Sequence, residues 1–126
     1  MVQVLTLMPS EPVRLDPDRL GMLYRQLGEV ASEDVICRAV EELAARLCQC
    51  ERLWRQGDMA SLRKGARSLI AIADQVGMTA LAKSAHHVTD AVDGGDRTAT
   101  AATLSRLIRV GERSLTAVWD PQDLSV

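Results

Sequence analysis

Two short stretches of this 126-residue chain hold the side chains that could do chemistry. One carries the basic residues Arg63, Lys64 and Arg67, and the other is the pair His86 and His87. A guanidinium group stays protonated and binds carboxylate or phosphate through two parallel hydrogen bonds. An imidazole has a free lone pair near neutral pH and can accept a phosphoryl group. The arginines therefore indicate anion binding, and the histidines are the candidates for phosphoryl transfer.

The two histidines stand at adjacent positions of a predicted helix. His86 and His87 each lie about 130° from its apolar stripe, on opposite sides, so both are expected to be exposed. A helical two-histidine metal site needs i, i+4 spacing, whereas adjacent rings diverge. No metal and no cofactor are expected. The sequence also lacks a nucleophile elbow, a glycine-rich phosphate loop and a paired-carboxylate arrangement.

Composition argues against several other classes of function. The formal net charge of −2 disfavours nucleic acid, and the basic run RKGARS lacks interleaved aromatic residues. The apolar opening of the chain has no basic leader and is too short to span a membrane or to act as a signal peptide. Cys37, Cys48 and Cys50 fall in one predicted helix and are expected to be ordinary thiols of a reducing compartment. We therefore expect a cytoplasmic protein.

Hydrophobic periodicity predicts an all-α fold. Alanine and leucine are plentiful, and strand-type alternation is nearly absent. Four long helices, each with one apolar stripe, are expected to form an antiparallel up-down-up-down four-helix bundle with a short additional N-terminal helix. The bundle spans residues 16–120, between an N-terminal tail (1–15) and a C-terminal tail (121–126). The predicted N-caps are Asp16, Ser32, Asp58, Thr79 and Thr98, and the helices end near Leu27, Gly57, Gly77, Gly94 and Trp119.

The same stripes predict the buried residues. Side chains spaced by four and three residues share one face of a helix. The core should be aliphatic, because the chain has no Phe, one Tyr and two Trp. The residues expected inside are Ile36, Val40, Leu43, Leu47, Cys50 and Trp54 of the second helix, Leu62, Ala66, Leu69, Ala73 and Val76 of the third, Leu81, Ala85, Val88 and Val92 of the fourth, and Ala101, Leu104, Ile108, Gly111, Leu115 and Val118 of the last.

The third helix and the turn after it resemble the core of histidine-containing phosphotransfer (HPt) domains. The motif of that family runs A-H-x-L-K-G-x-A-x-x-x-G, followed by a leucine that opens the next helix. The resemblance extends more weakly to the GGD turn before the last helix, and it implies an HPt-like bundle that works in a two-component phosphorelay. The positions that match the motif are Ala66, Leu69, Ala73, Gly77 and Leu81.

The departures fall on the positions that the family uses for chemistry. Arg67 stands at the position equivalent to the phosphoacceptor histidine. Ile70 replaces the lysine of the motif, Ala71 replaces its glycine, and Thr89 replaces a frequent glutamate. A guanidinium keeps its proton and offers only donors, so Arg67 cannot accept a phosphoryl group. The resemblance therefore implies no enzyme but a pseudo-phosphotransfer module that binds a partner without carrying phosphate.

One flank of the third helix, about 80° to 140° from its core side, is the expected docking flank. In the HPt family this flank meets an acidic receiver domain, so a response-regulator receiver domain or a histidine kinase is the implied partner. Two alternatives remain open: an active phosphotransfer protein that uses His86 or His87, and a helical dimerisation or adaptor domain unrelated to phosphorelay. A monomer or weak homodimer is expected. The docking residues are Arg63, Lys64, Arg67, Ile70, Ala71 and Asp74.

Overall fold

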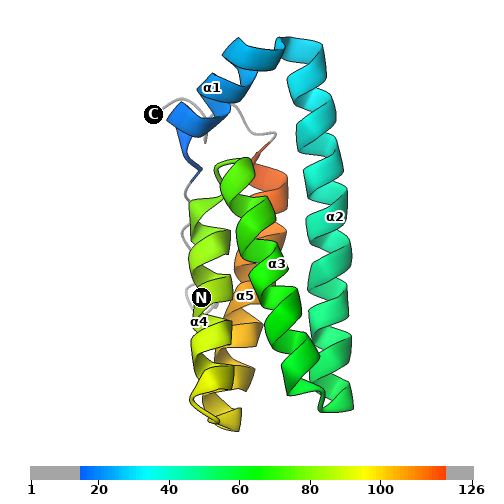
Figure 1. Ribbon diagram of the computed structural model, residues 1–126, viewed down its shortest axis with the longest axis vertical. Coiled ribbons are helices and arrows are strands. Elements are labelled where there is room, and N and C mark those ends of the chain that lie inside the picture. Colours follow the sequence, from blue (N-terminus) through cyan, green and yellow to red (C-terminus); the bar gives the residue numbers. More distant parts are fainter. Residues whose placement is uncertain (1–14, 119–126) are drawn as a thin grey trace, which may run out of the picture.

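The computed structural model describes residues 15–118, which form five helices joined by short turns (Figure 1). Within this range the regular secondary structure is helical, apart from one isolated antiparallel bridge between Leu15 and Met78. The prediction of an all-α fold is confirmed. The helices are α1 (Pro17–Leu27), α2 (Glu29–Gln56), α3 (Met59–Gln75), α4 (Thr79–Asp93) and α5 (Arg97–Ala117).

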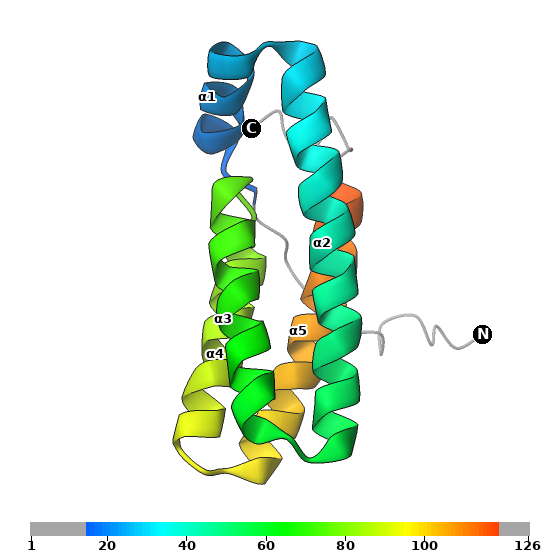
Figure 2. The same cartoon turned by 45° about the vertical axis from the view of Figure 1, so that its right-hand side comes forward.

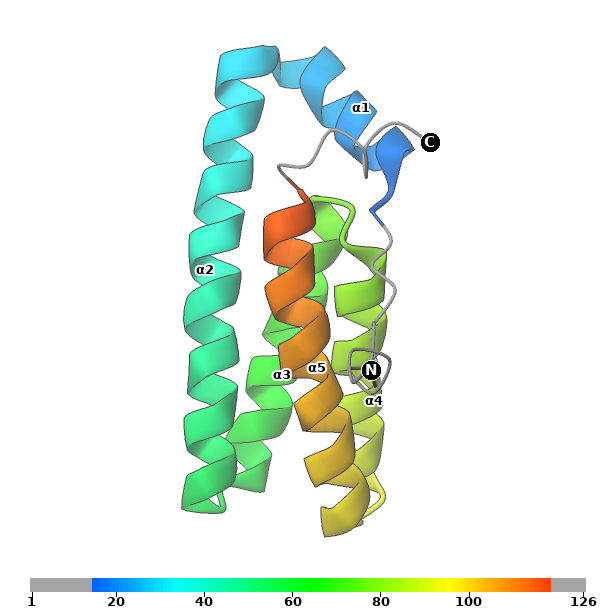
Figure 3. The same cartoon turned by 180° about the vertical axis from the view of Figure 1, so that it is seen from behind.

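The four long helices, α2 to α5, lie side by side along the long axis of the molecule (Figures 1 and 2). α3 contacts α2 and α4, and α5 contacts α4 and α2, so the four helices close around a common core. α2 is longer than α3, with 28 residues against 17, and its first turns extend beyond the other long helices. There α1 packs against α2 and lies across that end of the bundle (Figure 3).

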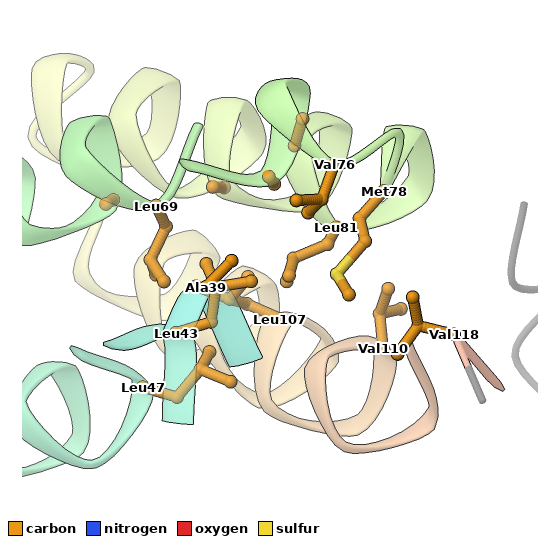
Figure 4. Packing of buried hydrophobic residues seen from close by; sticks show 14 of the residues in the cluster. Ala39, Leu43, Leu47, Leu69, Val76, Met78, Leu81, Leu107, Val110 and Val118 are labelled. Atoms are coloured by element: carbon orange, nitrogen blue, oxygen red, sulfur yellow. The ribbon is translucent and has the colours of Figure 1, made fainter. Parts of the chain in front are cut away.

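The core is aliphatic, as the composition predicts. Burial of one such side chain contributes about 1.5–3 kcal/mol to folding. Four leucines, one from each long helix, are fully buried and point toward one another (Figure 4): Leu43, Leu69, Leu81 and Leu107. In and directly after α3, every residue expected inside is buried: Leu62, Ala66, Leu69, Ala73 and Val76.

Two of the predicted N-caps are confirmed and one start is misplaced by several residues. Asp16 and Asp58 cap α1 and α3, and each side chain accepts a hydrogen bond from a backbone N–H of the first turn. Gly28, at φ +82°, ends α1, and α2 begins directly after it. Ser32 therefore lies inside α2 and is not its cap. Its buried hydroxyl donates to the Leu23 carbonyl oxygen at 3.0 Å, so it joins α1 to α2 instead.

The other two predicted caps are also wrong. Met78 occupies the N-cap position of α4, and Thr79 is the first helical residue. Asp96 caps α5, where its carboxylate accepts from the Ala99 N–H at 2.9 Å, and Thr98 lies in the first turn. Aspartate and threonine both suit this position, and the side chain nearer the glycine turn takes it.

The buried face of α5 is wider than the one stripe predicted for it. α5 packs against both α4 and α2, so residues on two adjoining stripes point inward. Gly111 allows α5 to approach α2 closely, since a Cβ atom added there would lie 2.6 Å from Cδ1 of Leu47. Leu107, Val110 and Ser114 are buried as a result. The residues expected inside that are only half-buried are Val40, Trp54, Val92, Ala101, Ile108 and Leu115.

The turn between α3 and α4 also anchors the start of the described chain. Gly77 ends α3 as predicted, at φ +74°, a conformation that favours glycine. The Asp16 N–H donates to the Gly77 carbonyl oxygen at 2.7 Å, and Leu15 pairs with Met78. Leu15, expected in the N-terminal tail, is buried and belongs to the core.

Several expectations concern residues outside the described range. Residues 1–14 of the expected N-terminal tail, the end of the last helix at Trp119, and the expected C-terminal tail (121–126) all fall there. Among the helices of residues 15–118, none has the length and apolar character needed to cross a membrane.

Candidate partner-docking groove

A surface groove lies between α3 and α4, on the flank where docking is expected. It has a volume of about 440 Å³ and exposes both polar and apolar atoms. Two neighbouring helices are needed to make it, because each supplies one wall. We call it the α3–α4 groove, and it is lined by Arg63, Arg67, Ile70 and Ala71 of α3 and by His86, Thr89, Asp90 and Asp93 of α4.

The buried stripe of α3 positions its groove residues. Ala66 and Leu69 have no exposed surface, which fixes the rotation of the helix against the core. Arg67 directly follows Ala66, and Ile70 directly follows Leu69. Their side chains therefore point about 100° away from those of the buried residues. Arg67 is exposed and Ile70 is half-buried. The rotation calculated from the sequence therefore agrees with the burial of these side chains.

A bidentate ion pair closes one end of the α3–α4 groove. Arg63 donates from Nε to Oδ1 of Asp93 at 2.5 Å and from a terminal nitrogen to Oδ2 at 3.1 Å. These hydrogen bonds hold the pKa of the Asp93 carboxyl below its usual value, and the nearby charge of Arg67 adds to the effect. Arg63, expected to bind a partner, is thus already engaged by its own chain.

Sequence reasoning missed Asp93 because no local pattern connects it with Arg63. The two residues are 30 positions apart and lie on different helices. One signal was available. Arg63 precedes Gly77 by 14 residues and Asp93 follows it by 16, so a hairpin folded at Gly77 brings them to the same level.

Arg67 is the basic residue that the groove leaves available. Its guanidinium makes no direct hydrogen bond or ion pair with another residue of the described range 15–118. Ile70 and Ala71 provide apolar surface next to it in the same groove. A planar cation beside an apolar wall suits a carboxylate or phosphate group carried by a protein surface.

Two of the expected docking residues are not part of the groove. Lys64 and Asp74 are exposed on α3, but neither lines the groove between α3 and α4. At about 100° per residue, Lys64 lies outside the expected docking flank, whereas Asp74 lies within it but near the end of α3, beyond the groove residues. The helical period gives the direction of each side chain about the axis of α3, whereas the position of α4 decides which of these side chains line a groove.

The two histidines separate onto different surfaces, as their adjacent positions predict. His86 is exposed in the α3–α4 groove, whereas His87 is half-buried in a second groove between α4 and α5. The expectation that both are exposed is therefore correct only for His86. Thr89 is buried, and its hydroxyl donates to the His86 carbonyl oxygen at 2.7 Å.

The remaining candidates for chemistry are isolated from one another. Within residues 15–118, no group of three or more His, Cys, Asp or Glu side chains could hold a metal ion. Cys37 and Cys48 are exposed and Cys50 is buried, and all three are free thiols. Burial raises the pKa of the Cys50 thiol to about 11, which keeps it protonated and unreactive at neutral pH.

Comparisons with protein families, with curated proteins and with solved structures gave no match.

Proposed function

We propose that this chain is a non-catalytic, HPt-like signalling module that binds a receiver domain or a histidine kinase without carrying phosphate. The proposal includes the finer fold, an antiparallel up-down-up-down four-helix bundle of the HPt kind. What supports that fold is the closed set of contacts among α2 to α5 and the short turns that join them. The motif resemblance on α3 supports the family.

The observation that carries the proposal is the placement of Arg67. In the motif resemblance it aligns with the phosphoacceptor histidine of HPt domains, and it is exposed in a groove with apolar neighbours. A guanidinium there can bind an acidic partner but cannot accept a phosphoryl group. Binding without transfer is the function that this replacement supports.

The groove also suggests how the contact is divided among its residues. Arg67 engages a carboxylate or phosphoryl oxygen of the partner, and Ile70 contacts an apolar part of it. Arg63 stays paired with Asp93 across α3 and α4 and is not available to the partner. The interface is small and charged, so a micromolar Kd that weakens as salt rises is expected.

Two measurements on the full chain test this function. A pull-down from native lysate, read by mass spectrometry, should recover proteins that contain receiver or histidine-kinase domains. The recovered receiver is then purified and titrated against the chain. Arg67→Glu should weaken its binding by about tenfold or more, since it places a negative charge against an acidic partner.

The matched control is Arg52→Glu, which makes the same charge change at an exposed position of α2. It should leave the Kd nearly unchanged. Equal effects of the two substitutions would reject the α3–α4 groove as the docking site. Recovery of neither kind of signalling domain would reject the proposed function as a whole.

A dimerisation or adaptor role is a second candidate, favoured by a different part of the molecule. The exposed large apolar residues of the described range all lie in α1 and the first turns of α2. Exposed apolar residues concentrated in one part of a chain are typical of an interaction surface. Sedimentation that shows a concentration-dependent dimer, lost on Val30→Glu, would support this role. The residues are Met22, Leu27, Val30 and Val35.

A further inference from the structure

Another groove lies between α2 and α5 and carries apolar surface that the fold leaves partly uncovered. Its volume is about 360 Å³, and its apolar lining consists of Trp54 from α2 and Ala101, Leu104 and Ile108 from α5. Trp54, Ala101 and Ile108 are only half-buried. We call it the α2–α5 groove (Figure 3 shows these two helices side by side). It shares no residue with the α3–α4 groove, so it is a separate surface.

The apolar surface continues beyond the groove toward the end of the bundle that α1 covers. Leu115 follows Ile108 by seven residues, about two turns, and so lies on the same side of α5. Val40 precedes Leu47 by seven residues, and Leu47 packs against α5 at Gly111. Val40 and Leu115 are also half-buried. Apolar periodicity predicts these residues inside, so a line of core-type side chains stays partly exposed between α2 and α5, as is typical of an interaction surface.

Charged residues on the same side of α2 differ in sign along its length. Arg55 is exposed and lines the groove near Trp54. Arg97 of α5 stacks over the Trp54 ring at 5.1 Å and adds positive charge at that end. Glu41, also exposed, precedes Arg55 by 14 residues, which is about 21 Å along the helix and within about 40° of the same direction. The exposed Cys48 lies halfway between them.

We propose that a second copy of this chain packs against the α2–α5 groove, with α2 and α5 each antiparallel to the same helix of the other copy. The two-fold axis passes beside Cys48. Arg55 of each copy then meets Glu41 of the other, because both lie seven residues from the axis. Ile108 is one turn from the close contact of α5 with α2 at Gly111, so the two copies of Ile108 meet near the axis. The pairing buries the apolar line that the single chain leaves half-buried.

The distribution of charge favours this arrangement over the other two-fold pairing of the same face. An axis parallel to the helices would set the end that carries Arg55 and Arg97 against the same end of the other copy, and like charges repel. The antiparallel pairing brings opposite charges together. Arg109 also lines the groove, but it already donates to the Ser105 hydroxyl at 2.9 Å, so no contact across the interface is assigned to it.

Thiol crosslinking of the full chain tests the position of the axis. The two copies of Cys48 should lie side by side, whereas Cys37 is about 16.5 Å further along α2, so its two copies are about 33 Å apart. A short bismaleimide should therefore give a covalent dimer that is kept in Cys37→Ser and lost in Cys48→Ser. Both thiols are exposed, so random collisions would link them equally. Equal yields through the two cysteines, or no covalent dimer, would overturn the proposal.

Sedimentation equilibrium of charge variants tests the pairing. Arg55→Glu should raise the dimer Kd by about tenfold, because symmetry places the repulsive contact with Glu41 in the interface twice. Glu41→Arg in the same chain should restore the Kd. Arg38→Glu makes the same charge change at an exposed position of α2 about 100° away, and it should have little effect. If Arg55→Glu behaves like Arg38→Glu, the assigned pairing is wrong.

Val30→Glu separates this interface from the exposed apolar residues of α1 and the first turns of α2. The α2–α5 dimer should persist in this variant, whereas its loss would place the dimer contact at Val30 and overturn the proposal. This inference does not depend on the proposed receiver docking, which uses α3 and α4.

Discussion

Leu69 and Ile70 are neighbours in α3, but Leu69 is fully buried in the core whereas Ile70 is half-buried on the wall of the α3–α4 groove. The same holds for Ala66 and Arg67, of which one is buried and one exposed. One helix therefore carries two surfaces about 100° apart. The core face meets leucines of three other helices (Figure 4), and the groove face meets α4 and solvent.

This difference separates stability from binding. A substitution on the core face removes contacts that the folded state needs, so it should lower the free energy of unfolding. A substitution on the groove face removes fewer contacts of the folded state, so it should change affinity more than the free energy of unfolding. Substitutions on the two faces can test that separation, and the largest loss of stability is expected on the core face.

Leu69→Ala should destabilise the protein by about 2–5 kcal/mol, because it leaves a cavity among fully buried leucines. Urea unfolding followed by circular dichroism measures the change. Ile70→Ala is the matched control on the adjacent groove face and should cost less than half as much. Similar losses for both would mean that the two faces are not distinct.

Gly77→Ala should destabilise the protein by about 2–3 kcal/mol, also by chemical unfolding. The residue adopts φ +74°, and an added Cβ would lie 2.9 Å from the Asp16 carbonyl oxygen. Gly57→Ala isolates the backbone strain, since Gly57 has φ +76° and nothing within 4 Å of an added Cβ. A loss at Gly77 no larger than that at Gly57 would show that Asp16 does not pack against this turn.

Cys50 should resist iodoacetamide at pH 8 in the folded protein, whereas Cys37 and Cys48 react, as read by mass spectrometry. Burial raises the pKa of Cys50 to about 11, so its thiol is more easily ionised in the unfolded chain. The resulting stability is present below a pH of about 9 and is lost as the pH rises through 11. Loss of the alkaline transition in Cys50→Ser would identify Cys50 as its source. Rapid labelling of Cys50 would show that this part of the core opens.

The Arg63–Asp93 pair should give the smallest effect on stability, because both side chains are largely solvent-exposed. A double-mutant cycle with Arg63→Gln and Asp93→Asn measures the coupling, which should decrease in high salt. The pKa of Asp93 is lowered by Arg63, so the coupling is present above the usual carboxyl range and is lost as the pH falls below it. A coupling energy much larger than that of the exposed Arg46–Glu42 pair would contradict this prediction and would show that the Arg63–Asp93 pair behaves like a buried one.

Local chemistry made some features predictable. Asp16 and Asp58 cap helices with side chains that reach only two or three residues along the chain, so no tertiary contact is needed to explain them. The apolar period of α3 gave both its buried face and the exposure of Arg67. The HPt resemblance was also visible at this level, because it rests on residue types and spacing.

Contacts between distant residues decided the rest. Ser32 has the properties of an N-cap, but its hydroxyl bonds to Leu23 across the corner between α1 and α2. Ala101 and Ile108 fit a helical period as well as Thr100 and Leu107 do. Thr100 and Leu107 are the buried ones because the neighbouring helices pack against their side of α5.

By itself the sequence determined that the chain forms helices, where most of them break, and which side of α3 turns inward. Those properties depend on backbone preferences and on the spacing of apolar residues within one segment. Only the tertiary structure decided that Arg63 pairs with Asp93, that His86 shares a groove with Arg67, and that Lys64 and Asp74 do not. Each of these depends on the distance between two helices, which is set by how their side chains pack and not by the pattern of either helix alone.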